Sequence, residues 1–179
     1  MWIMITNIVL FQLGWFACVL SSAAQRPWVG ATIALSIVGF HLFRAHKREA
    51  EIKLVLIALG IGTVWDSILV SQTWIQYDSG LFFSNLAPYW IILMWGLFAT
   101  ILNVSLRWLR ERWMMAALFG AIGGPLAYYG GHRLGALRFG NEHVALLALA
   151  VGWAILTPLL MALATRFDGY AHMTKERMP

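Results

Sequence analysis

The amino-acid sequence predicts an all-α integral membrane protein, a bundle of six transmembrane helices with both termini in the cytoplasm. Composition, six long apolar runs and the placement of positive charge support this prediction. Of the 179 residues, 60% are hydrophobic and 12% are charged, whereas a soluble domain has about 25% charged residues. The chain is long enough for one compact bundle. A net charge of +5 spread over short clusters does not form the basic face of a nucleic-acid-binding domain.

The apolar runs define the helices. A helix that crosses the hydrocarbon core of a bilayer needs about 20 mostly apolar residues. Six runs qualify, of which the second is the shortest, and in chain order they cover residues 3–24, 27–43, 54–75, 87–108, 113–131 and 143–165. We therefore predict a transmembrane domain over residues 1–166 and a polar cytoplasmic tail over residues 167–179.

Positive charge is distributed unevenly between the two sides that these runs define. Ten of the 13 Lys and Arg residues lie around the connections after the second and fourth runs and in the C-terminal segment. Arg26, Arg133 and Arg138 lie on the other side. Cytoplasmic segments of membrane proteins carry an excess of Lys and Arg, so both termini are expected in the cytoplasm. An even number of spans agrees with this, because it places both termini on the same side.

The two halves of the chain show a faint repeat. "GWFACVL" (Gly14–Leu20) is similar to "GLFATIL" (Gly96–Leu102), and "LIALGIG" (Leu56–Gly62) is similar to "LLALAVG" (Leu146–Gly152). Two units of three helices would have opposite orientations, which is the arrangement of many transporters. A weak 3+3 inverted repeat is one interpretation, and the shared composition of membrane segments is the other.

Asp66, in "GIGTVWDSIL", lies near the centre of the third run. A helix that starts near Leu54 places it about 18 Å into the bilayer, where an aspartate costs about 2.5–3.5 kcal/mol on insertion scales. Trp15, Gln12 and Tyr128 fall at similar depths and can donate hydrogen bonds to a carboxyl group. We predict these four residues as a ligand-binding or proton-transfer site. The alternative is a buried interhelical hydrogen bond, which contributes only about 0.6 kcal/mol on average.

Two further features concern helix packing. Asn7 and Asn103 fall about 6–8 Å from the cytoplasmic surface and are expected to form a second polar layer between the first and fourth helices, with Ser105 pointing elsewhere. In the fifth run, small residues recur at spacings of 4, 3 and 4 around Pro125, at Gly120, Gly124, Ala127 and Gly131. This small-residue face permits close packing of another helix, and the proline-kinked helix is expected to shape a cavity near Asp66.

Other chemical signatures are sparse. The five histidines do not form the clustered boxes of a metal-dependent membrane enzyme, and His41 and His46 miss the i, i+4 spacing that places two ligands on one helical face. No metal and no cofactor is predicted. Catalytic residues stay unassigned, and whether the protein is an enzyme stays open.

Four segments together resemble one family: "NIVLFQLGWFACVL", "VWDSILVS", "LAPYWIILMWGLFATILNVSLRWL" and "GAIGGPLAYYGGHRLGAL". They are similar to small bacterial inner-membrane proteins grouped as domain of unknown function 2878. The resemblance implies a multi-pass protein of the bacterial inner membrane with no established activity. It also implies a connection to lipid, because members often occur beside genes for enzymes that modify unsaturated fatty acyl chains.

The leading functional hypothesis is the handling or modification of a lipid-like, fatty acyl molecule in an intramembrane cavity around Asp66. A small proton-coupled transporter and a non-enzymatic scaffold subunit are the alternatives. A cavity that opens sideways to lipid favours the first, a polar path to both faces favours the second, and the absence of a cavity favours the third. The expected partners are membrane lipid, a lipid-modifying enzyme, or a second copy through the fifth helix.

Overall fold

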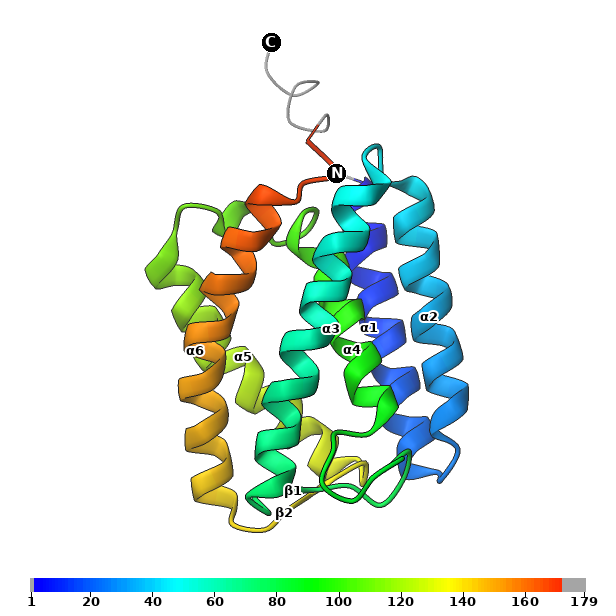
Figure 1. Ribbon diagram of the computed structural model, residues 1–179, viewed down its shortest axis with the longest axis vertical. Helices are drawn as coiled ribbons and strands as arrows, with labels where there is room; N and C mark the ends of the chain where they lie inside the picture. Colours follow the sequence, from blue (N-terminus) through cyan, green and yellow to red (C-terminus); the bar gives the residue numbers. More distant parts are fainter. Residues whose placement is uncertain (1, 172–179) are drawn as a thin grey trace.

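The computed structural model describes residues 2–171, and over that range the chain folds as six α-helices (Figure 1). The helices are α1 (Trp2–Ala23), α2 (Pro27–Arg44), α3 (Arg48–Ser71), α4 (Tyr89–Leu102), α5 (Trp113–Arg133) and α6 (Glu142–Arg166). A 3₁₀ turn, η1 (Arg107–Leu109), and a short antiparallel pair, β1 (Ile75–Gln76) with β2 (Arg138–Phe139), lie in the connections. The prediction of an all-α fold is confirmed.

Four of the described helices, α1, α2, α3 and α6, are long and apolar enough to cross a membrane. α4 has 14 residues and extends only about 21 Å, less than the ~30 Å hydrocarbon core. α5 has 21 residues, but its glycines, Pro125 and its polar last turn reduce its hydropathy. The apolar helices and the composition are those of a membrane protein.

The boundaries of α3 and α4 differ from the predicted runs. α3 starts at Arg48 rather than residue 54, because its first turn carries Glu49 and Glu51, and acidic side chains stabilise a helix N-terminus. α4 ends at Leu102 rather than residue 108. Its C-cap residue is Asn103, whose carbonyl oxygen accepts a hydrogen bond from Arg107 Nε at 2.8 Å.

The central helix of the bundle is α4. It packs against α1, α2 and α3 and more lightly against α6, while α1 pairs with α2 and α5 pairs with α6 (Figure 1). A 3+3 repeat would require α4 to pair with α5 as α1 pairs with α2, and that pairing is not formed. The helix packing therefore does not follow the repeat expected from the sequence.

Both chain ends of the described bundle lie at the same end of the molecule. Figure 1 shows the start of α1, the end of α6 and the α2–α3 and α4–α5 connections together at the top. The other connections lie at the bottom, where β1 pairs with β2 and Arg138 forms an ion pair with Asp78. The segments rich in Lys and Arg thus share one end.

Tryptophan rings packed on glycines hold neighbouring helices close together. A Cβ added at Gly62 of α3 would lie 2.0 Å from the Trp95 ring of α4. One added at Gly152 of α6 would lie 2.1 Å from the Trp65 ring of α3. Neither position has room for a side chain, so these glycines set the distances between α3, α4 and α6.

The predicted small-residue face of α5 is used within the chain. A Cβ added at Gly120 would lie 2.1 Å from the carbonyl oxygen of Trp153 in α6, and one added at Gly124 would lie 2.3 Å from the Trp153 ring. Gly131 faces Leu137, in the connection that follows α5. The face is covered by α6 and this connection, which leaves little of it for contact with a second copy.

Candidate functional site in the bundle interior

Asp66 is completely buried at the centre of the site, with 0% of its surface exposed. Its Oδ2 accepts a hydrogen bond from Trp95 Nε1 at 2.7 Å, and its Oδ1 accepts one from the Tyr128 hydroxyl at 2.6 Å. The Tyr77 hydroxyl, in the segment after β1, makes a longer contact with Oδ1 at 3.5 Å. One carboxyl group thus joins α3 to α4, to α5 and to the α3–α4 connection.

The structure brings only Tyr128 of the three expected donors to Asp66. Trp15 and Gln12 lie on α1, which packs on α2 and α4 rather than on α3. Depth along the membrane normal, used in the sequence argument, does not specify the direction in which a helix face points. The sequence did not predict Trp95 and Tyr77 as donors. The helical rise along the fourth run places Trp95 at a depth similar to that of Asp66, and this is the signal that identifies it as a further donor.

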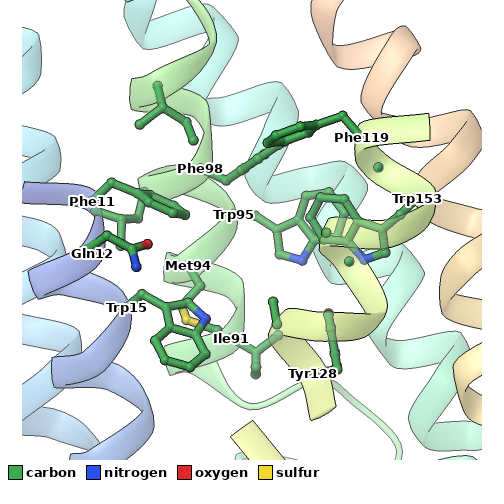
Figure 2. Close-up of a pocket in the computed structure, with 16 residues that line it drawn as sticks. Phe11, Gln12, Trp15, Ile91, Met94, Trp95, Phe98, Phe119, Tyr128 and Trp153 are labelled. Atoms are coloured by element: carbon green, nitrogen blue, oxygen red, sulfur yellow. The ribbon is translucent and has the colours of Figure 1, made fainter. Parts of the chain in front are cut away.

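A cavity of about 340 Å³ lies beside this hydrogen-bonded group, between α1, α4, α5 and α6. Figure 2 shows Gln12 and Trp15 extending from α1 on one side, with Phe119 and Tyr128 of α5 on the other. Its wall is mostly apolar and aromatic and is formed by Phe11, Gln12, Trp15, Ile91, Met94, Trp95, Leu97, Phe98, Ile101, Phe119, Gly120, Gly123, Gly124, Ala127, Tyr128 and Trp153.

Asp66 itself does not line the cavity. Trp95 and Tyr128 lie between the Asp66 carboxyl group and the cavity. Each contributes its ring to the wall of the cavity and donates a hydrogen bond from its N–H or O–H to the carboxyl group. Trp95 also stacks on Trp153, with ring centroids 4.7 Å apart and an interplanar angle of 14°. The carboxyl group therefore positions the rings of the wall.

The cavity opens between α1 and α5. These two helices do not pack extensively on each other, although Gly130 of α5 approaches the Trp15 ring. Gln12 on α1 is exposed, and Phe119 on α5 is 41% exposed.

Three polar groups of the wall have no hydrogen-bond partner among the described residues. They are the Gln12 carboxamide, the Trp15 indole N–H and the buried Trp153 Nε1. Gln12 lies midway along α1. The Gln12 and Trp15 groups are available to a molecule that enters the cavity, whereas Trp153 Nε1 is fully buried.

A second buried polar group, which the sequence did not predict, closes the end of the bundle that carries both chain ends. Glu51 is 0% exposed and accepts hydrogen bonds from Asn103 Nδ2 at 2.6 Å and from the Gly169 backbone N–H at 2.9 Å. Its other oxygen lies 2.9 Å from His41 Nε2. Its position in the polar sequence "REAEIK" gave no sign that Glu51 is buried.

The first residues of the predicted tail belong to this closure. Asp168 forms ion pairs with Arg107 at 2.9 Å and Arg110 at 2.8 Å. The Tyr170 hydroxyl donates to the His41 carbonyl oxygen at 2.6 Å. Burial raises the pKa of that hydroxyl above its ordinary value, so Tyr170 stays a donor. Residues 172–179 of the tail lie outside the described residues.

The expected pairing of Asn7 with Asn103 is not formed. Asn7 Nδ2 donates to the Thr100 carbonyl oxygen at 3.1 Å, and Asn7 Oδ1 accepts from Ser105 Oγ. Asn103 turns instead to Glu51. Ser105 and Asn103 do point to different partners, but Ser105 is the one that meets Asn7, because α4 has already ended at Leu102.

No group of three or more His, Cys, Asp or Glu side chains within residues 2–171 is arranged to hold a metal ion. The site offers a laterally open apolar cavity, aromatic rings fixed by a buried carboxyl group, and a few unpaired donors. These are the features of a binding chamber for an apolar or weakly polar molecule.

Together, the fold and the site define a helical integral membrane protein with an internal cavity that opens to the side. The model of one family, described as "Protein of unknown function (DUF2878)", matches residues 4–159. The chain belongs to this family, as the four sequence segments predicted. No curated protein and no solved structure matches the chain.

Proposed function

We propose that this protein binds a lipid-like molecule, such as a fatty acyl chain, that enters the cavity sideways from the bilayer. The observation that carries the proposal is the cavity of about 340 Å³ that α1, α4, α5 and α6 enclose. Ligand pockets range over about 300–1,000 Å³, so this one suits a single chain or a small ring with a short tail. A complete diacyl phospholipid exceeds it.

Asp66 has a positioning role in this proposal. It receives the N–H of Trp95 and the O–H of Tyr128, so both residues turn their apolar surfaces to the ligand. The same arrangement weighs against the proton-coupled transporter. Such a transporter needs a hydrated path to its acid, whereas Asp66 and all three of its donors are buried.

We further propose that all six helices cross the inner membrane of a bacterium, with both termini in the cytoplasm. The common position of the two ends and the excess of Lys and Arg there support this orientation. α4 is short, but other helices surround it, and Glu51, Asn103 and Arg110 satisfy polar groups beyond its C-terminal end. Irregular backbone at membrane depth is tolerated where protein covers it.

The test is to fill the cavity without disturbing the packing. A Cβ added at Gly123 meets only the Phe119 ring at 4.0 Å, and Gly123 lines the cavity. Gly123→Leu therefore places a branched side chain in the cavity. Gly60→Leu is the matched control, because Gly60 lies on α3, is exposed and has no atom within 4 Å of its added Cβ.

The measurement is native mass spectrometry of the protein extracted in mild detergent, which detects retained lipid. We expect the parent and Gly60→Leu to carry a bound lipid and Gly123→Leu to lose it, at equal yield and equal thermal stability. Equal lipid retention by both variants would overturn the proposal.

A further inference from the structure

Gln12 occupies an unusual position for a polar side chain. It lies midway along α1, it is exposed at the mouth of the cavity, and it has no hydrogen-bond partner among the described residues. An amide in an apolar environment without a partner is costly. Polar residues within membrane segments are rare and usually mark a functional pathway.

Trp15 lies one turn further along the same face, and its indole N–H also has no partner in the described part of the chain. The other wall donors near it are engaged, because Trp95 and Tyr128 donate to Asp66. Figure 2 shows Gln12 and Trp15 side by side on α1, extending toward the space that α5 borders. The mouth thus presents two adjacent donors.

The bilayer limits what can supply an acceptor at this depth. Half of the ~30 Å hydrocarbon core, about 15 Å, separates the bilayer centre from the headgroup region. The ester oxygens of a phospholipid stay near that region and do not reach Gln12. A matching acceptor must belong to an uncharged lipid whose oxygen-bearing group can reside in the hydrocarbon.

The wall adds a preference for a flat group. Seven of the 16 lining residues are aromatic, and aromatic pairs in offset-stacked or edge-to-face arrangements gain about 0.5–1.5 kcal/mol beyond their buried area. A saturated chain gains little by moving from lipid into this cavity, because lipid tails are equally apolar. Selective binding therefore needs ring contacts and hydrogen bonds.

We propose that the preferred occupant is an uncharged lipid with a flat, carbonyl-bearing ring on a hydrocarbon tail, of the quinone class, whose carbonyl oxygen accepts from Gln12 and Trp15. This proposal rests on the proposed function, since it names the class of molecule that the cavity holds. The ring lies against the aromatic wall, and the tail leaves between α1 and α5 into the bilayer.

The test uses decylbenzoquinone as the probe and tryptophan fluorescence as the signal, with the protein in lipid nanodiscs. Gly123→Leu keeps every tryptophan, so the difference in quenching between parent and Gly123→Leu isolates binding in the cavity. Decylbenzene, which has the ring and tail but no carbonyl, and a saturated fatty acid serve as competitors. Gln12→Leu removes the donor while keeping the size of the side chain similar.

We expect decylbenzoquinone to quench the tryptophan fluorescence of the parent more than that of Gly123→Leu. The apparent affinity of decylbenzene, measured by competition, should be at least about tenfold weaker than the affinity of decylbenzoquinone. Gln12→Leu should weaken the quinone about five- to tenfold, the effect of one lost hydrogen bond, and leave competition by the fatty acid unchanged. Equal affinity of the quinone for parent and Gln12→Leu, or equal competition by decylbenzene, overturns the ring-carbonyl assignment. The proposed function survives that result if Gly123→Leu still loses its retained lipid.

Discussion

Replacement of Asp66 by leucine should destabilise the bundle, although it removes an acidic residue from the bundle interior. Leucine is close in size but accepts no hydrogen bond, so Trp95 and Tyr128 lose the acceptor that lies 2.7 and 2.6 Å from their donors. A buried donor left without a partner costs about 1–3 kcal/mol. The 3.5 Å contact with Tyr77 is long and contributes little. We expect a loss of about 2–6 kcal/mol from the two short bonds.

Asp66→Asn should be milder. The amide oxygen can accept from Trp95, whose indole N–H only donates, while the amide nitrogen donates to the Tyr128 oxygen, which can also accept. One bond is kept and one is reversed, so the loss should be small, about 0.6 kcal/mol, which is the average for hydrogen bonds within membrane bundles. The predicted order of stability is parent, then Asp66→Asn, then Asp66→Leu.

The assay is reversible unfolding in mixed micelles with increasing sodium dodecyl sulfate, followed by tryptophan fluorescence and by helical circular dichroism. Val64→Leu serves as the control, because Val64 lies on α3 and is 63% exposed to the surroundings. An Asp66→Leu protein that unfolds at the same detergent fraction as the parent would refute the role given to these hydrogen bonds.

Three further predictions follow from the packing and the ends of the bundle. Gly124→Leu should lower stability by about 1–3 kcal/mol or more through overpacking, because a Cβ added at Gly124 already lies 2.3 Å from the Trp153 ring. Gly60→Leu is the control. Equal melting temperatures for the two variants would contradict the close α5–α6 packing. Glu51→Ala leaves three buried donors without their acceptor, so a loss of about 3–5 kcal/mol is expected, and an unchanged unfolding midpoint would disprove it. Reporters inserted at residues 45–47 should signal cytoplasm and those at 80–86 the opposite side, and the reverse pattern would invert the proposed orientation.

Much of the architecture follows from local sequence. Hydropathy averaged over a helix length indicates where the chain can be solvated by lipid, and it located α1, α2, α5 and α6 within a few residues of their ends. The cost of one aspartate at the bilayer centre required Asp66 to face protein. Depth along the helices also placed Tyr128 near it, because rise per residue is a local property.

The tertiary structure decided which side chains meet. Asp66 takes Trp95 and Tyr77 as donors, while Gln12 and Trp15 line the cavity, because the direction of each helix face depends on packing between distant segments. α4 ends at Leu102 because Asn103 bonds to Glu51 and to the Phe167 carbonyl oxygen, 52 and 64 residues away in the chain. Hydropathy reports the solvent of each segment by itself. Hydrogen bonds between helices depend on the rotation of each helix about its axis and on which helices are neighbours in the bundle. The sequence of a single segment determines neither.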